Sequence, residues 1–287
     1  MKVISWNILH GQPLPPPEPW LDEERSLELL RHSTGILAAA IGKGPFVLGI
    51  QEVDALQPRS AYLHQTEVIA EALGAGAEYW GFAPAIFGTP GEPWRSAKRE
   101  PVKIFTHETE AKVLKGAGPT YGDGLITNIP VKKWHRCELG KSRVGVNMKF
   151  PDGKGGRNTF YIKDENRVAL IAELENGYTV AVTHLSFVPF VNLYQYWKLL
   201  IFMWRIPGKK IVMGDFNLPW NIPSKFSLRR SLKSEMTFPI WEPKVQIDYL
   251  LVPRLRSWAR KLKVSPLEIP VLDLSDHLPH GVEINEA

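Results

Sequence analysis

Four acidic side chains lie at or beside the ends of apolar segments that have the composition of buried strands. They are Glu52, Asp215, Asp248 and Asp276. An acid beside a buried strand is costly unless its charge is compensated, and one divalent cation can compensate several acids at once. The ligands would be oxygens and the chain has a single cysteine, so the pattern favours Mg²⁺, Mn²⁺ or Ca²⁺ over structural zinc.

Neutral polar side chains accompany these acids. Asn7 ends the first apolar segment, and Asn217 stands two residues after Asp215, so both side chains of that pair point the same way in an extended chain. His184 ends the segment TVAVTH, and His277 closes the motif SDH. Their imidazoles could supply hydrogen-bond donors or a base near neutral pH.

Each motif also has a structural explanation when it is taken alone. The sequence GDFN at 214–217 is typical of a turn, and Glu52 could cap a helix. His184 could be a satisfied core histidine, and Asp248 could pair with an arginine. All these explanations would have to hold together at the ends of different strands, so the sequence favours one metal-assisted site.

Alternating apolar patterns predict the elements that position these residues. Strands are expected at residues 3–9, 45–53, 124–129, 167–174, 178–184, 210–213 and 246–252. Helices are expected at 22–41, 61–73 and 193–206, the last of them apolar on most sides and therefore wedged into the body of the molecule. A stiff proline-rich loop is expected at 13–17 and a hairpin turn at 151–158.

The composition is that of an ordinary globular protein. Of 287 residues, 44% are hydrophobic and 23% charged, which argues against disordered, collagen-like and coiled-coil chains. The single cysteine, Cys137, excludes an internal disulfide framework. No linker divides the sequence, so one α/β domain is expected over residues 1–287.

Charge and hydropathy limit the partners and the location. The net charge of +5 suits an anionic partner without the dense basic footprint of an obligate nucleic-acid binder. The sequence shows neither a secretory signal pattern nor the run of about 20 apolar residues that a membrane-spanning helix needs. A cytoplasmic location is therefore expected, and the oligomeric state stays open.

The ordered set of motifs resembles the endonuclease/exonuclease/phosphatase superfamily. That superfamily includes pancreatic-type deoxyribonucleases, abasic-site endonucleases, neutral sphingomyelinases and inositol polyphosphate 5-phosphatases. The motifs occur in family order over nearly the whole chain: WN, QE, GDGLITNIP, ENRVALIAEL, THLS, GDFN, IDYLLV and SDHLP. The resemblance implies an α/β fold built as a four-layer α/β/β/α sandwich with two mixed β-sheets.

The resemblance also implies a metal site. Glu52 would bind the catalytic Mg²⁺ or Mn²⁺, with Asp276 and Asn7 nearby, and Asn7 would also face the phosphate. The sequence departs from the abasic-site endonucleases at Leu9, where those enzymes carry an acid two residues after the asparagine. This departure weakens a DNA-repair interpretation and removes one metal contact.

The remaining motif residues would act on the phosphate. By resemblance, Asp215 and Asn217 would contact the attacking water and the phosphate, and His184 would bind the scissile phosphate or assist the leaving group. His277, oriented by Asp248, would be a general base or a donor to a phosphate oxygen.

Arg167 would support the site as the basic residue before a central strand. Thr127-Asn128 stand where many members have Ser-Arg, a change expected to affect neighbouring packing rather than chemistry.

The leading hypothesis is a metal-dependent phosphodiesterase that acts on DNA or RNA. Basic stretches at 95–103, 225–233 and 254–263 could follow a phosphate backbone, and Trp220 could stack on a base. The first alternative is a lipid or inositol phosphate hydrolase, in which the apolar residues 187–190 would contact a membrane peripherally; capping of the core by these residues is the simpler expectation. The second is an inactive member that binds an anionic partner.

Overall fold

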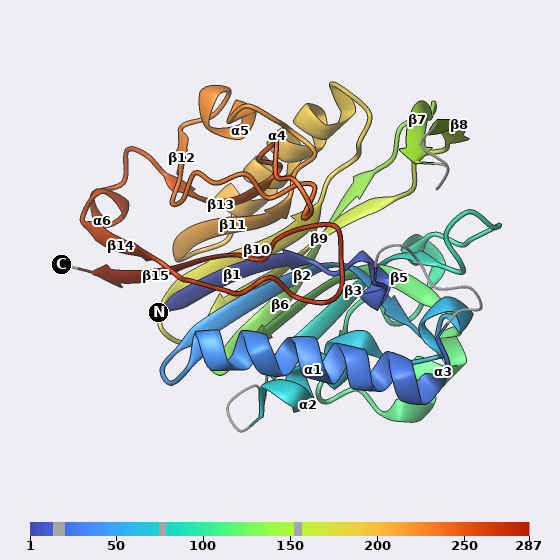
Figure 1. Cartoon of the computed structure of the whole chain (residues 1–287). Helices are drawn as coiled ribbons and strands as arrows, with labels where there is room; N and C mark the ends of the chain where they lie inside the picture. Colours follow the sequence, from blue (N-terminus) through green and yellow to red (C-terminus); the bar gives the residue numbers. More distant parts are fainter. Residues whose placement is uncertain (14–20, 75–78, 152–156, 287) are drawn as a thin grey trace.

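Two β-sheets face each other at the centre of the molecule, in a computed structural model that describes residues 1–13, 21–74, 79–151 and 157–286 (Figure 1). The first is a 7-stranded sheet in the order β14-β15-β1-β2-β5-β3-β4. Its strands are β1 (Lys2–Asn7), β2 (Phe46–Ala55), β3 (Tyr79–Phe87), β4 (Phe105–Thr106), β5 (Thr120–Thr127), β14 (Leu262–Pro266) and β15 (His280–Glu286).

The second is a 6-stranded sheet in the order β12-β13-β11-β10-β9-β6. Its strands are β6 (Val131–Gly140), β9 (Arg167–Leu174), β10 (Tyr178–His184), β11 (Lys209–Asp215), β12 (Arg229–Ser231) and β13 (Asp248–Pro253). Both sheets are mixed, because β1 pairs with β2 and β10 with β11 in parallel while the other neighbours are antiparallel. A separate hairpin joins β7 (Val146–Pro151) and β8 (Arg157–Ile162).

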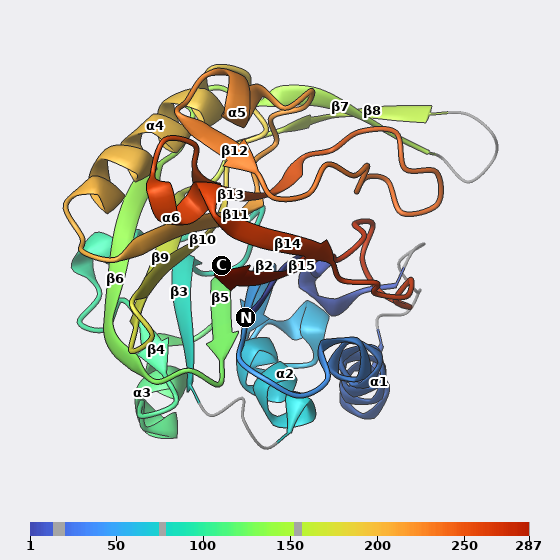
Figure 2. The same cartoon turned by 90° about the vertical axis from the view of Figure 1, so that its left-hand side faces the viewer.

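Helices cover the outer faces of both sheets (Figures 1 and 2). On the first sheet lie α1 (Glu23–Ile41) and α2 (Gln65–Leu73), and on the second lie α4 (Val191–Trp204) and the short α5 (Ile222–Lys225). Two further short helices are α3 (Ala111–Ala117) and α6 (Ser257–Arg260). The four-layer α/β/β/α arrangement expected from the motifs is therefore confirmed. Within the described ranges, no helix is both long and apolar enough to cross a bilayer.

Side-chain alternation along the strands divides the interior into three cores. In β11, Ile211 and Met213 lie in the core between the sheets, whereas Val212 lies in the core under α4. In β1, Val3 faces the second sheet and Ile4 faces the helices of the first. Because successive strand residues point to opposite faces, every second residue is directed between the sheets up to the end of each strand.

The helix boundaries have local causes. Helix α1 begins after Asp22, whose carboxylate accepts a 2.9 Å hydrogen bond from the Arg25 amide. Helix α2 begins at Gln65 rather than at the expected 61, because Ala61 has φ of 53° after a 3₁₀ turn and His64 serves as the N-cap. Gly74 ends α2 as expected, with φ of 79°.

The strands expected at 167–174 and 178–184 are found with those bounds, and the other expected strands are displaced or lengthened by a few residues. The expectation that 193–206 is wedged into the body is wrong, because α4 buries only one face and leaves Trp197 and Trp204 exposed. Most of the loop expected at 13–17, and the tip of the hairpin at 151–158, lie outside the described residues. The strands on either side of that tip do pair as a hairpin.

Buried His64 makes the stability of the fold depend on pH. Burial lowers its pKa to about 4, so it is neutral in the folded chain while it gains a proton in the unfolded chain below its ordinary pKa of 6.5. The contribution of neutral His64 to the free energy of unfolding is therefore fully present above pH 6.5 and is lost as the pH falls toward 4. Between roughly pH 7 and pH 5 the loss is about 2 kcal/mol. We expect His64→Asn, whose side-chain oxygen can replace Nδ1 as the N-cap acceptor, to lose correspondingly less stability over this range in urea unfolding. Equal losses for both proteins would contradict this.

Candidate active site

Four polar residues named from the sequence lie at one open edge between the sheets. Asn7, His184 and Asp215 are the last residues of β1, β10 and β11, and Asp248 is the first residue of β13. Alternation along each strand directs all four between the sheets, in line with core residues such as Met213. All four are buried.

Glu52 reaches the same edge through an irregularity in its strand. Regular alternation after Ile50, which faces the helices, would place Glu52 on the helix side. Instead the register of β2 shifts between Ile50 and Val53, and Glu52 adopts φ of 56°. This β-bulge directs the carboxylate inward. The expected strand at 45–53 contains Glu52, and in the structure β2 continues two residues further, to Ala55.

Glu52 lies among one side-chain amide and two imidazole rings. The Asn7 amide donates a 3.0 Å hydrogen bond to Oε1, and Nδ1 of His184 and Nδ1 of His10 lie 3.8 Å from Oε1 and Oε2, respectively. Burial alone would raise the pKa of Glu52, but the neighbouring His10 and His184 rings and the Asn7 amide hold it well below its ordinary value. The carboxylate is therefore charged at neutral pH without a Lys or Arg partner among the described residues.

His184 and Asn217 fix each other's orientation. The Asn217 side-chain amide donates to the carbonyl of Leu185 at 3.0 Å and lies 3.1 Å from Nε2 of His184. Since that amide is the donor, Nε2 accepts and Nδ1 carries the proton, directed toward Glu52. Burial, followed by the charge of Arg167, lowers the pKa of His184 far below its ordinary value, so the ring is neutral.

His277 and Asp248 form a buried pair. Nδ1 of His277 lies 2.9 Å from Oδ2 of Asp248, which also accepts a 2.6 Å hydrogen bond from the Thr237 hydroxyl. Burial would lower the pKa of His277, but the charge and hydrogen bond of Asp248 and the charge of Asp215 raise it to about 10. Nε2 of the resulting imidazolium is 3.7 Å from Oδ2 of Asp215.

Asp215 connects the two halves of the site. Its Oδ2 accepts a 3.2 Å hydrogen bond from the side-chain amide of Asn7, and its Oδ1 accepts a 2.9 Å bond from the backbone N–H of Asn217. Burial raises its pKa above the ordinary aspartate value; the cation of His277 opposes this, and the charge of Asp248 adds to it. Gly214 permits this geometry, because a Cβ there would lie 1.9 Å from the carbonyl oxygen of Thr183.

Asp276 and Trp220 lie at the margin. Burial raises the pKa of Asp276, and the charge of Glu52 adds to this, while its Oδ1 lies 3.8 Å from Nε2 of His277. Trp220 is 75% exposed on the loop after β11, three residues beyond Asn217. The structure thus brings all of the named acids and histidines together and leaves Trp220 on the surface.

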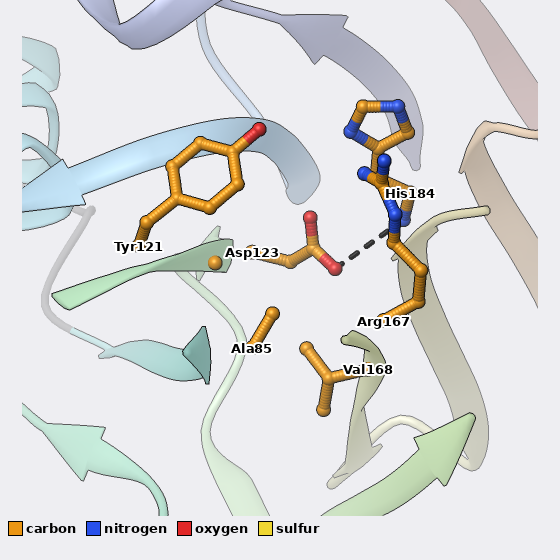
Figure 3. A pocket seen from close by; sticks show the side chains of 7 residues that line it. Ala85, Tyr121, Asp123, Arg167, Val168 and His184 are labelled. Carbon is orange, nitrogen blue, oxygen red and sulfur yellow. Dashed lines mark hydrogen bonds between the residues drawn. The ribbon is translucent and has the colours of Figure 1, made fainter. Parts of the chain in front are cut away.

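Arg167 lies beneath His184 in a small buried pocket with Asp123 (Figure 3). Asp123 accepts a 3.3 Å hydrogen bond from the backbone amide of His184, and burial raises its pKa to about 8. Arg167 lies 3.7 Å from the carboxylate of Asp164 and over the ring of Phe187. From this position the charge of Arg167 helps to lower the pKa of His184.

Sequence reasoning missed three residues that contact this site: His10, Asp123 and Thr237. His10 stands three residues after Asn7 of the Trp-Asn motif and Asp123 stands inside GDGLITNIP, so both are polar residues in or near recognised motifs. Thr237 lies in a loop outside the recognised motifs, so the sequence did not mark it as a site residue. At the departure noted from the sequence, the Thr127 hydroxyl donates to the carbonyl of Phe46, and Oδ1 of Asn128 accepts from the Phe46 N–H.

The donor set fits a divalent cation better than it fits a closed salt-bridge network. Four carboxylates face a single imidazolium, and burial together with the charges of Glu52 and Asp248 raises the pKa of both Asp215 and Asp276. Side-chain atoms of Asp215, Asp248 and His277 lie within 4.8 Å of one another. Asp248 and His277 already bind each other, however. Charged Glu52 and Oδ1 of Asp276, which has no hydrogen-bond partner among the described residues, therefore offer the freer ligands.

Residues 4–277 match the model of the Endonuclease/Exonuclease/phosphatase family. The chain belongs to this family. The resemblance seen in the motifs is thereby confirmed, and with it a phosphoesterase class whose members are generally dependent on divalent metals. No curated protein matches the sequence.

Solved structures of the Endonuclease/Exonuclease/phosphatase family share the fold. A family protein from Beutenbergia cavernae is 16% identical, with a TM-score of 0.53 over 100% of this chain and 71% of that one. The human Nocturnin catalytic domain with bound sulfate is 19% identical, with a TM-score of 0.55 over 100% and 93%. A mannosyl-6-phosphatase from Bacteroides thetaiotaomicron is 12% identical, with a TM-score of 0.55 over 99% of both chains.

The charge of Asp248 should control the protonation of His277. In Asp248→Asn the hydrogen bond can persist, but the negative charge that raises the pKa of His277 is lost, so that pKa should fall from about 10 toward or below neutrality. Titration of the imidazole nitrogens by ¹⁵N NMR measures this change. Thr237→Val, which removes a neutral hydroxyl, is the matched control and should have a smaller effect. An unchanged His277 titration in Asp248→Asn would contradict the assignment.

Proposed function

We propose that this chain hydrolyses phosphodiesters with the help of a divalent cation, and that a nucleic-acid strand is its substrate. The observation that supports the reaction is the convergence of Glu52, Asp215 and His277, far apart in sequence, at one buried edge between the sheets. Family membership supports the broader phosphoesterase class.

Glu52, with Asn7 and Asp276 beside it, would hold Mg²⁺ or Mn²⁺. A cation bound there would offset the charge of the clustered acids and the charge that develops on the phosphate oxygens. One or two carboxylates completed by water and substrate oxygens suit Mg²⁺, which keeps much of its hydration.

The protonation states of His277, Asp215 and His184 suit them to different roles in the reaction. His277 is a cation whose Nδ1 is bound to Asp248, so its Nε2 proton is free to bind a phosphate oxygen. Asp215 has a raised pKa, which suits it to orient a water molecule and accept its proton. Neutral His184, held by Asn217, directs its Nδ1 proton into the site and can bind the phosphate or the leaving group.

The choice of nucleic acid rests on exposed Trp220, which stands close to Asn217 and offers a stacking surface for a base. A lipid phosphodiester is a second candidate, because the exposed Phe190 lies beside the same edge, where Asn192 donates a 2.9 Å hydrogen bond to the Asn217 carbonyl. Solved family members carry names as different as Nocturnin and mannosyl-6-phosphatase, so the fold leaves the substrate open.

Removal of either catalytic partner should stop turnover without unfolding the protein. We expect Asp215→Asn and His277→Gln each to lower the rate by roughly two orders of magnitude or more, as is typical of lost proton-transfer and charge-stabilising groups. The assay compares DNA, RNA, sphingomyelin and a bis-aryl phosphate, with circular dichroism as the check of fold. The buried histidine variant His64→Asn is the matched control and should retain activity at pH 7.

The results also separate the candidates. Near-normal rates in either catalytic variant would refute the assigned roles, and cleavage of sphingomyelin alone would refute the nucleic-acid substrate. No turnover of any phosphoester with any metal would favour an inactive family member that binds an anionic partner.

Glu52→Gln should weaken metal binding directly. It retains the shape and the Asn7 contact but removes the charge that attracts the cation. Titration of Mn²⁺ followed by electron paramagnetic resonance should show a dissociation constant raised about tenfold or more, a magnitude typical of altered metal sites. Glu165→Gln, near but not in the cluster, is the control. The ligand role of Glu52 would be wrong if both variants bound Mn²⁺ like the wild-type protein.

A further inference from the structure

Helix α4 and its N-cap residue Phe190 carry a line of exposed large apolar side chains. We call it the α4 stripe, and its members are Phe190, Tyr194, Trp197, Ile201 and Trp204, which are 85%, 64%, 44%, 59% and 77% exposed. The intervals of four, three, four and three residues place them on one face of the helix. The opposite face packs on the second sheet through Tyr196, Leu199 and Met203. Contiguous apolar surface of this kind on a folded domain commonly marks a contact with another apolar phase.

A cavity of about 610 Å³ adjoins the α4 stripe at its C-terminal end. Trp197 and Trp204 belong to both, and the remaining walls come from the start of β11, the end of β13, β12 and α6. The cavity lies at the opposite end of β11 from Asp215, about 20 Å away at the rise of an extended strand. It is therefore separate from the candidate active site.

The cavity contains an unpaired buried cation. Arg229 is 9% exposed, and its Nη1 is buried without a hydrogen-bond partner in the part of the chain that the structure describes. No carboxylate of the described residues forms a salt bridge with Arg229 or with Arg256, which also lines the cavity. Lys210 is nearby, and burial and the charges of both arginines lower its pKa. An anion is the missing partner of this group.

The surrounding sequence is strongly basic, and only some of its charges are paired, such as Lys233 with Glu235. Between residues 186 and 234 the only acid is Asp215, which lies in the candidate active site. The same segment carries eight basic residues: Lys198, Arg205, Lys209, Lys210, Lys225, Arg229, Arg230 and Lys233. Lys209 pairs with Glu286 from the C-terminal strand. Two of the basic stretches noted in the sequence, 225–233 and 254–263, thus contribute to this cavity and not to the active site.

We propose that the α4 stripe and the adjoining cavity dock on an anionic phospholipid bilayer, with the aromatic side chains in the interfacial layer and a lipid phosphate at Arg229. Tryptophan and tyrosine favour that layer, and basic residues beside an apolar face are attracted to anionic lipids. This inference does not depend on the proposed phosphodiesterase activity.

Charge and shape favour a bilayer over two other occupants. A second copy of the chain, docked by two-fold symmetry on the same patch, would bring two uncompensated basic surfaces together. A nucleic-acid strand could stack bases on Trp204 but would leave the aliphatic Ile201 and Leu228 without an apolar partner. A bilayer supplies both apolar depth for the stripe and negative charge for the arginines.

Vesicle flotation of the full chain tests this proposal. The protein should float with vesicles of phosphatidylcholine and phosphatidylglycerol, much less with phosphatidylcholine alone, and less at high salt. The double variant Ile201→Ser/Trp204→Ser should lose about tenfold or more in affinity. Arg229→Gln and the surface variant Arg256→Gln should each lose about fivefold, the effect of one basic residue near an anionic surface.

Two substitutions away from this face are the matched controls. Val271→Ser removes an equally exposed apolar side chain, and Arg25→Gln removes an exposed guanidinium on α1. Both should float like the wild-type protein. A thermal midpoint close to wild type shows that a variant has folded, and Arg256→Gln keeps the test valid if Arg229→Gln does not.

Several outcomes would overturn the proposal. They are absence of wild-type flotation with anionic vesicles, and full flotation of the stripe variant or of both arginine variants. Displacement from vesicles by inorganic phosphate alone would identify a free-anion site instead. Light scattering that shows a dimer lost in the stripe variant, or an oligonucleotide bound through the same residues, would identify a different occupant.

Discussion

Burial of excess negative charge at one edge between two sheets is the constraint on which the candidate site depends. Four carboxylates converge there, and His277 is the single imidazolium among them. The surrounding hydrogen bonds do not neutralise this charge but distribute it: Asn7 bridges Glu52 and Asp215, and Asp248 binds the imidazolium. Unneutralised buried charge of this kind destabilises a protein interior, but it can bind a cation and, through that cation, a phosphate.

Backbone geometry allows the charges to meet. Parallel pairing of β10 with β11 sets His184 beside Asp215, and antiparallel pairing of β11 with β13 sets Asp215 opposite Asp248. Ordinary alternation is sufficient for these three residues. Glu52 needs the bulge in β2, a local exception to the pleat that turns one side chain from the helix face to the inner face.

The two ends of β11 present opposite chemistries. At one end, Asp215 belongs to a cluster with an excess of negative charge. At the other end, the cavity contains arginines without a carboxylate partner among the described residues. Helix α4 spans the distance between them: its N-terminal end is joined to the active-site loop through Asn192, and its C-terminal end forms a wall of the cavity. A membrane held by the α4 stripe would thus lie along the second sheet, beside the mouth of the site.

The sequence by itself determined the fold family, the strands β9 and β10 to the residue, and the set of acids and histidines that meet. Period-two alternation and motif order are local properties, and strand ends carry polar residues because the apolar interior stops there. Only the tertiary structure decided that Glu52 enters the site from a bulge, that Thr237 completes the His277–Asp248 pair, and that α4 leaves one apolar face uncovered. The bulge depends on how β2 pairs with β5, and the Thr237–Asp248 hydrogen bond depends on how a loop folds back against the site. An apolar helix face has the same sequence pattern whether or not another layer covers it, so only the structure shows that this face of α4 is exposed.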